Sequence, residues 1–584
     1  MSKLAWNDIN WTLVHKRISR QQRRVYKASK EKNKVKVHAI QNQMLLSLDT
    51  KLLAIREITT RNEGYNIISL GETEIISHEQ RVELAYKLKF NRNLWIIKTS
   101  YLQKYINGNG NLTNIQIIED RVKQMVVRLV LEPEWEAIFE PNSYAFRPGR
   151  SYCDSIAVLS YVLKKKYQHI LNIDTRKCFS KIDHKQLLQK LETFLLLENQ
   201  IEIWLRFNIM SENLNKSNQI IQFIEDKSQS NTILPLLINI ILHGLENHIK
   251  NWYVNIWYLT LKKSSRIAKR RKKTIVGFSR YGYDFIITAP NYKDIKLIEN
   301  QTIIWLNNKT GLELSKIRIK VISSRRGFEY LGFQIISIKS SVQNKYKTKI
   351  YPSRSSKNNI IQQVRKIIQE NKSISSYFLI IILSRQLVTW GNYFRYWNCI
   401  EDFSKLDFLI FNQIRAWVFR RKSKGLKSRT KLKLKYFPEG NIYHFRGKVY
   451  KNNWILTGKI LNKKGIVKEN FLPKLVWIGS SKYIKIKENV SCYNINHAYW
   501  VKRAEKYSNF THRVSKLIRI QKGYCNWCGF GFTPMDIIEV DHITPRLKGS
   551  SDRYKNLQAI HRFCHKQKSR FEESVLANIQ TSFP

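Results

Sequence analysis

Four metal-binding side chains near the end of the chain show the spacing of a zinc site. Cys525 and Cys528 form a CxxC pair, and His561 and Cys564 repeat that spacing further along. Three thiolates and an imidazole in two such pairs supply the four ligands of a tetrahedral structural Zn²⁺ site. The seven cysteines are an odd number and lie mostly far apart, which favours metal binding in a reducing compartment over disulfides.

Four more polar residues stand between and beside these expected zinc ligands: Asp541, His542, Asn556 and His565. Their pattern resembles that of the HNH, or ββα-metal, nucleases over about residues 521–570. The resemblance implies that His542 is the general base for an attacking water. It also implies that Asp541 and His565 hold one divalent cation, while Asn556 holds the loop that orients His542. A zinc-stapled knuckle that binds nucleic acid without catalysis is the alternative.

Two carboxylates stand at the ends of predicted strands earlier in the chain. Residues 169–174 form a buried strand pattern that ends at Asp174, and residues 278–288 form two short strands around a tight turn beside Asp284. Carboxylates that meet across a sheet can bind the Mg²⁺ pair that drives nucleotidyl transfer. Spacing alone does not show that they meet, and an ordinary acidic turn is the alternative.

The charge of the chain points to a polyanionic partner. Its 584 residues include 102 Lys and Arg against 44 Asp and Glu, a formal charge of +58. Such self-repulsion favours nucleic acid as the partner, with binding that weakens as salt rises. No apolar run is long enough to span a bilayer, and the basic runs lack an apolar helical face, so no membrane partner is expected. The candidate phosphate contacts are Arg147 and Arg150 in a loop between Pro and Gly, Arg270 and Arg271 in a basic run, and Arg420 and Arg421 after a helical stretch.

An ordered series of motifs resembles the reverse transcriptase of group II intron-encoded proteins, the maturases. The motifs are Asn142–Ser151 (NSYAFRPGRS), Asn172–His184, Leu234–Ile240 (LPLLINI), Arg280–Phe285 (RYGYDF), Gly311–Ser315 and Gly327–Phe333. Together with the opening helices, they cover almost the whole chain. The resemblance implies that the chain binds its intron RNA, promotes splicing, and cleaves duplex DNA during intron mobility.

Two departures from the family pattern fall in the polymerase motifs. Tyr283 stands where the family has the first Asp of its Tyr-Ala-Asp-Asp block, and a phenol is a poor Mg²⁺ ligand at neutral pH. Gln229 remains in a loop that has lost both of the family's glycines, which puts close backbone approach to a nucleotide in doubt. We therefore expect Asp174, Asp284 and Gln229 to be relics of a degenerate polymerase. A fully active reverse transcriptase and homing endonuclease is one alternative, and an RNA-binding splicing cofactor without enzymatic activity is another.

The expected architecture is multidomain α+β, with right-hand fingers and palm, a helical thumb, a basic linker region and an HNH module with a zinc clamp. The expected units are 1–110 (N-terminal helical extension and fingers), 111–345 (fingers and palm), 346–437 (thumb, or maturase domain), 438–510 (basic DNA-binding linker) and 511–584 (HNH endonuclease). A helix is expected over residues 117–131.

The expected cofactors are Mg²⁺ or another divalent cation and a structural Zn²⁺, and a homodimer is left open. The chain is rich in Ile, Lys and Asn, whose codons are rich in A and T, as in an organelle's genome. Together with the lack of a transit peptide pattern, this favours synthesis inside an organelle, the chloroplast before the mitochondrion.

Overall fold

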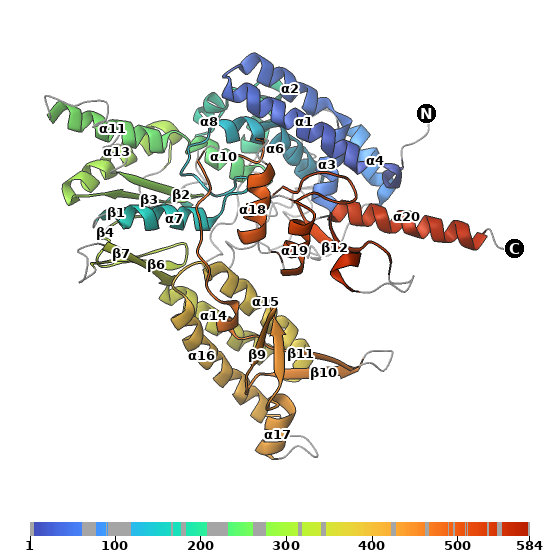
Figure 1. Ribbon diagram of the computed structural model, residues 1–584. Coiled ribbons are helices and arrows are strands. Elements are labelled where there is room, and N and C mark those ends of the chain that lie inside the picture. Colours follow the sequence, from blue (N-terminus) through green and yellow to red (C-terminus); the bar gives the residue numbers. More distant parts are fainter. Residues whose placement is uncertain are drawn as a thin grey trace, which may run out of the picture.

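The computed structural model shows a helical and β-sheet body with a small module at its C-terminal end (Figure 1). It describes residues 5–60, 77–88, 90, 118–164, 168–176, 183–206, 232–260, 276–312, 318–339, 346–421, 428–461, 467–488, 490–494, 497–507, 510, 512–533, 536–545 and 552–581. Gln229, Arg270 and Arg271 lie outside the described residues, so the predictions made for them stay predictions.

The N-terminal helices pack as a bundle on one long helix. They comprise η1 (Trp6–Asp8), α1 (Trp11–Lys30), α2 (Lys34–Leu46), α3 (Leu48–Thr60) and α4 (His78–Lys87), and α1, α2 and α3 contact α6 (Ile118–Ile138). Trp11, Val14 and Ile18 recur at helical spacing and are buried, which is what holds α1 on the bundle. The expected helix over 117–131 continues to Ile138 through Pro133, so its predicted end was wrong.

A four-stranded antiparallel sheet forms the centre of the body. Its strands are β1 (His169–Asp174), β2 (Gly277–Tyr281), β3 (Asp284–Ala289) and β4 (Arg318–Ser323), in the order β2-β3-β1-β4. Successive side chains of a strand face opposite sides, so the sheet separates two apolar cores. Leu171 and Phe285 join the core on one side, whereas Ile170 and Ile286 join the core on the other.

Helices cover both faces of this sheet. On the face of Leu171 lie α8 (His184–Leu191), α9 (Leu195–Arg206), α10 (Leu234–Ile241), α11 (Leu245–Thr260) and α13 (Tyr292–Thr310). On the opposite face lie α7 (Tyr152–Leu163) and a second sheet of β5 (Phe328–Tyr330), β6 (Phe333–Lys339) and β7 (Tyr346–Pro352).

Four helices follow the second sheet, as the spacing of residues 352–437 predicts. They are α14 (Arg354–Glu370), α15 (Ser376–Phe394), α16 (Ile400–Phe419) and α17 (Arg429–Tyr436). Two hairpins come next: β8 (Ile442–Phe445) with β9 (Lys448–Lys451), and β10 (Thr457–Leu461) with β11 (Val467–Phe471). The second hairpin packs on α15. After η6 (Leu475–Ile478), the chain returns to α7, where Ile486 N donates to Asp154 Oδ1 at 2.8 Å (Figure 1).

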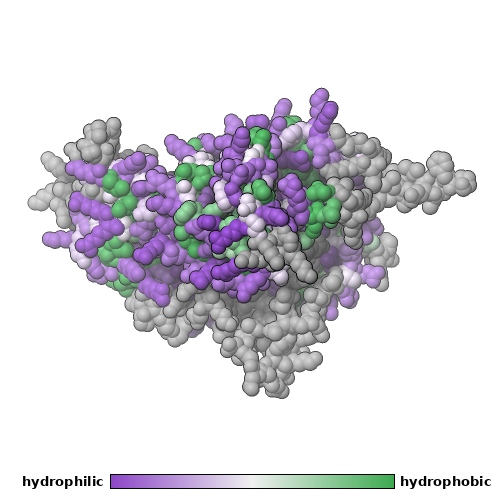
Figure 2. Space-filling model, turned by 90° about the horizontal axis from the view of Figure 1, so that it is seen from below, coloured by the Kyte–Doolittle hydropathy of each residue, from purple (hydrophilic) through white to green (hydrophobic). Residues whose placement is uncertain are grey.

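The C-terminal module has its own apolar core. It is built from α18 (His497–Tyr507), α19 (His512–Ile520), β12 (Ile538–His542), η8 (Tyr554–Asn556), β13 (Leu557–His561) and α20 (Arg562–Thr581). The strands β12 and β13 pair antiparallel, and α20 follows directly, which gives the ββα order. Among the described residues, no helix is long and apolar enough to cross a membrane. Figure 2 shows hydrophilic side chains over most of the described surface on one face, with apolar ones scattered between them.

Candidate nuclease, metal and nucleic-acid sites

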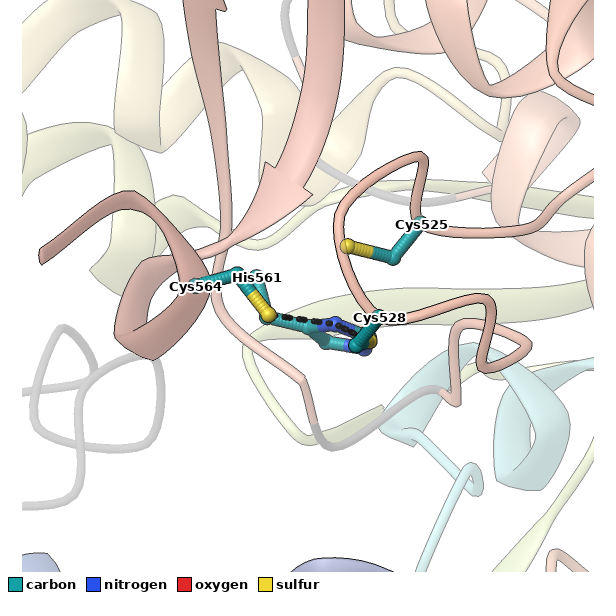
Figure 3. A group of neighbouring side chains, drawn as sticks. All are labelled: Cys525, Cys528, His561 and Cys564. Atoms are coloured by element: carbon teal, nitrogen blue, oxygen red, sulfur yellow. Dashed lines mark hydrogen bonds between the residues drawn. The ribbon is translucent and has the colours of Figure 1, made fainter. Parts of the chain in front are cut away.

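The structure brings together the four expected zinc ligands (Figure 3). Cys525 and Cys528 lie on the turn after α19, His561 ends β13, and Cys564 lies in the first turn of α20. One ligand atom from each residue lies within 4.8 Å of all the others. Three sulfurs and one imidazole nitrogen at this separation match the ligand set that Zn²⁺ prefers.

Two local features hold this cluster in place. Gly529, with φ +69°, closes the turn so that its N–H donates to Cys525 O at 2.8 Å. His561 Nε2 lies 3.4 Å from Asp536 Oδ2, which turns Nδ1 toward Cys528 Sγ at 3.4 Å. A carboxylate behind a ligating histidine fixes its tautomer and ring orientation. Asp536 is therefore a supporting residue that the sequence pattern did not reveal.

His542 ends β12 and is oriented by a carboxylate. Its Nε2 lies 2.7 Å from Asp552 Oδ1. This contact places the ring hydrogen on Nε2 and makes Nδ1 the basic nitrogen, as the third member of a catalytic triad does for its histidine. The geometry suits a general base.

Asn556 braces the loop that follows His542. Its Oδ1 accepts from Thr544 N at 2.9 Å, and its Nδ2 donates to Thr544 O at 3.2 Å. Its backbone O also accepts from Ile543 N at 2.8 Å. These three bonds hold the residues directly after His542, which is the role that the HNH resemblance implies for Asn556.

Asp541 and His565 meet across β12 and α20. His565 Nε2 lies 3.5 Å from Asp541 Oδ1, and His565 Nδ1 lies 2.8 Å from Glu539 Oε2. The Glu539 carboxylate therefore turns Nε2 toward Asp541, and one nitrogen and one oxygen at this separation fit a shared divalent cation. Asp541 Oδ2 accepts from Lys568 Nζ at 2.7 Å, so Asp541 Oδ1 remains directed at His565.

Three residues of this site were missed from the sequence. Glu539 is two residues from Asp541 on one strand, and Lys568 is three from His565 on one helix, so both spacings place the pairs on shared faces. Those spacings could have revealed them. Asp552 reaches His542 from a separate loop, and no local periodicity marks it.

Asp174 and Asp284 do meet, as pairing partners at the ends of β1 and β3. Arg176 lies against both: its Nη2 is 2.8 Å from Asp174 Oδ2, and its Nε is 3.8 Å from Asp284 Oδ1. Burial raises the pKa of Asp284 to about 7, although Arg176 opposes this effect. Burial also acts to raise the pKa of Asp174, but hydrogen bonds from Arg176 outweigh it and lower that pKa.

Tyr283 lies in the two-residue turn between β2 and β3. Its carbonyl oxygen accepts from Thr175 N at 3.1 Å and from Thr175 Oγ1 at 2.8 Å, which ties the turn to the end of β1. Its side chain is half-buried and packs against the apolar core beneath the sheet. With a phenol here and a guanidinium on the two carboxylates, these residues do not fit a pair of divalent cations.

The loop arginines have a different role from the one expected. Arg147 is buried, and its Nε and Nη2 donate to the two Glu136 oxygens at 2.7 and 2.9 Å. Its Nη1 donates to the carbonyls of Glu140 and Ser143. The Arg150 side chain is 3% exposed, and its Nε lies 3.7 Å from Glu136 Oε1. The predicted phosphate contact is therefore not supported, because both guanidinium groups lie against Glu136 of α6 and donate to backbone carbonyls.

Arg420 and Arg421 follow α16 and line two separate hollows. Arg420 lines a hollow of about 270 Å³ between α14 and α16, together with Arg365, Ile368, Gln369, Gln413 and Ala416. Arg421 is anchored by donating to the carbonyls of Lys372 and Ile374 and by lying 3.9 Å from the Trp417 ring centroid. It lines a hollow of about 560 Å³ that also includes Lys435 and Lys459. Neither lining contains an acidic residue.

Comparison with protein families agrees with this geometry. An N-terminal domain of reverse transcriptase matches residues 6–88, and a reverse transcriptase (RNA-dependent DNA polymerase) matches residues 106–335. A group II intron maturase-specific domain matches residues 357–437, and an HNH endonuclease matches residues 525–571. The chain therefore belongs to the class of proteins in which a reverse transcriptase domain is joined to an HNH endonuclease domain.

Individual relatives narrow the class. Maturase-like protein 1 of Euglena gracilis is 23% identical over 70% of this chain and 80% of its own length, and that of Euglena longa is 24% identical over 79% and 92%. Group II intron-encoded protein LtrA of Lactococcus lactis is 22% identical over 41% of this chain and 46% of its own. The chain belongs to the group II intron-encoded proteins, as a maturase with reverse transcriptase and HNH endonuclease domains, which confirms the expected family.

Proposed function

We propose that the HNH module cleaves duplex DNA, that the body binds the protein's own intron RNA to promote splicing, and that the polymerase site no longer copies RNA. The observation that carries the proposal is the complete nuclease constellation, in which Asp552 orients His542 and Glu539 orients His565 toward Asp541. At the polymerase site, in contrast, Tyr283 stands where a metal ligand is needed. Arg176 lies against the two carboxylates, where the metal itself would be needed.

In the nuclease, His542 accepts the proton of the water that attacks phosphorus, and Asp552 holds the resulting imidazolium in place. Asn556 keeps the loop after His542 fixed during this step. Asp541 and His565 would hold the divalent cation, which when bound stabilises negative charge on the phosphate and the leaving oxygen. Cys525, Cys528, His561 and Cys564 would hold a structural Zn²⁺ that staples β13 and α20 to the turn after α19.

The helices α14 to α17 form the thumb in this proposal, and together with β10 they supply an RNA-binding surface. Arg365 and Arg420 face the smaller hollow, while Lys435 and Lys459 join Arg421 at the larger one. Cations attract phosphate, and each cation that contacts phosphate adds to the salt dependence of binding. Lys459 is shared with Glu469, whose Oε1 lies 3.5 Å from its Nζ. The basic hairpin region 438–510 beside them is the proposed DNA-binding linker.

The chain is rich in Ile, Lys and Asn, whose codons are rich in A and T, and this usage supports an organellar site of synthesis, which we propose to be the chloroplast before the mitochondrion. The proposed unit boundaries are those expected from the sequence, at residues 110, 345, 437 and 510, and we leave open a homodimer.

The nuclease assignment is tested with the full chain, Mg²⁺ and a DNA duplex, scored as nicked strands on a denaturing gel. His542→Ala should lower the nicking rate by roughly 100- to 10,000-fold, the range that a general base contributes. His444→Ala removes an exposed histidine of β8 and serves as the matched control. Nicking that survives His542→Ala at the control rate would refute the assignment.

RNA binding is tested by measuring affinity for intron RNA at graded salt. Arg365→Gln and Arg420→Gln should each reduce the slope of log affinity against log salt by about one. Lys366→Gln on the same helix α14 is the charge-matched control, because Lys366 lies outside the hollow and 3.8 Å from Glu370. Equal changes for all three variants would argue against a specific surface.

A further inference from the structure

The aromatic side chain of Phe563 joins the nuclease module to the N-terminal helices. Phe563 lies in the first turn of α20, between two expected zinc ligands. Its ring stacks on His561 at 4.9 Å and 17°, and on His15 of α1 at 4.6 Å and 11°. Phe563 packs against the core of the body and against the module's own core. The two cores are therefore connected through this ring.

A buried cation fixes the other side of the joint. The Arg56 guanidinium of α3 lies 5.0 Å from the Phe563 ring centroid and 4.6 Å from that of Trp11, and it hydrogen-bonds to His15 Nε2. Burial lowers the pKa of Arg56 to about 10, which leaves it charged at neutral pH. A buried charge is costly unless it is compensated, and the faces of two aromatic rings provide part of that compensation. Removing Phe563 would take away one of the two.

Two weaker contacts also join the N-terminal segment to the nuclease module. Gln567 Nε2 of α20 donates to Ile9 O at 3.3 Å, and Lys16 of α1 lies 5.9 Å from the Phe530 ring centroid beside the zinc turn. Figure 1 shows the beginning of α20 lying next to α3. The contacts come from Ile9, α1 and α3 on one side and from the end of the module that carries the expected zinc ligands on the other, so the module is seated in a defined orientation.

We propose that the N-terminal helices are a docking platform for the nuclease, and that Phe563 is a positioning residue that sets where the DNA is cut. The inference rests on the proposed nuclease function, because it concerns the place of the cut and not the chemistry at His542. A body that holds intron RNA and target DNA presents one phosphodiester to a rigidly docked module. A module released from α1 and α3 still cuts, but at positions no longer fixed by the body.

The test uses the full chain with its intron RNA and a DNA duplex labelled on each strand, and it maps cut positions at nucleotide resolution. Hydrogen exchange at residues 11–18 and zinc content are measured on the same samples. Phe563→Ala should retain zinc, raise exchange at residues 11–18 at least tenfold, and spread the cuts over several nucleotides. Phe563→Tyr should restore a single cut position. Phe571→Ala, at an exposed aromatic of the same helix, is the control and should behave as wild type.

A single unchanged cut position with unchanged exchange in Phe563→Ala would overturn the proposal. If Phe563→Ala loses zinc, Arg56→Met decides from the other side of the joint: spread cuts with full zinc support docking, and an unchanged position refutes it. His542→Ala separates the two hypotheses. Cutting that persists in His542→Ala would refute the nuclease assignment, whereas the exchange at residues 11–18 would still report on the joint.

Discussion

Replacing Glu136 by Gln tests whether the loop arginines are structural. Glu136 accepts two hydrogen bonds from Arg147, and the two side chains are 1% and 2% exposed. Breaking a buried ion pair by removing one partner costs about 3–5 kcal/mol, because a charge is left uncompensated. Arg147 would keep its bonds to the carbonyls of Glu140 and Ser143, so we expect the lower end of that range, about 3 kcal/mol.

Local opening measured by hydrogen exchange is the appropriate assay, because a chain of several domains has no single unfolding free energy. The Tyr144 amide is a reporter, since it donates to Arg280 O at 3.0 Å beside the loop. A loss of about 3 kcal/mol should accelerate its exchange roughly 100-fold. The double variant Glu136→Gln/Arg147→Met should recover part of the loss, because it removes the Arg147 charge but leaves Arg150 without the Glu136 carboxylate that lies 3.7 Å from its Nε.

The opposite pattern would refute this reasoning. If Arg147 contacts phosphate, Arg147→Met should reduce the salt slope of RNA binding by about one without changing exchange at Tyr144. The structural role predicts faster exchange and an unchanged slope. The two readouts therefore separate the roles within one variant.

Three further predictions follow from the metal and polymerase sites. Asp174→Ala should leave the rate of intron splicing unchanged. A large loss of splicing rate in this variant would mean that splicing requires the Asp174 carboxylate. Zinc removal by a chelator should unfold the C-terminal module and raise exchange at residues 11–18, which the module covers, while α2 keeps its exchange protection, because structural zinc supplies on the order of 10 kcal/mol of folding free energy. Asp536→Ala should lower zinc affinity by roughly 10- to 100-fold, as measured by competition with a chromogenic chelator, and unchanged affinity would remove Asp536 from the site.

The sequence predicted the elements that follow local periodicity and short spacing. The hairpin from Gly277 to Ala289 followed from its β-branched and aromatic residues, and it is formed as expected. The ββα order of the module followed from the resemblance to the HNH nucleases, and the clustering of Cys525, Cys528, His561 and Cys564 followed from their spacing. In each case, the residues concerned lie near each other in sequence or in a motif that fixes its own geometry.

Contacts between distant segments could not be predicted in the same way. The meeting of Asp174 with Asp284 depends on the pairing of β1 with β3, which spacing cannot specify. Arg147 looked like a phosphate ligand because a basic loop residue gives no sign of a buried carboxylate partner eleven positions earlier. The stack of His15 on Phe563 joins opposite ends of the chain, and only the tertiary structure reveals it.

One assay addresses the central claim that the chemistry resides in the nuclease and not in the polymerase site. The full chain with its intron RNA is incubated with a labelled DNA duplex, Mg²⁺ and deoxynucleotides, and the labelled strands are resolved at nucleotide resolution. We predict a nicked strand that depends on His542 and is not lengthened. A nicked strand extended by nucleotides complementary to the intron RNA, and no longer extended in Asp174→Ala, would contradict the account.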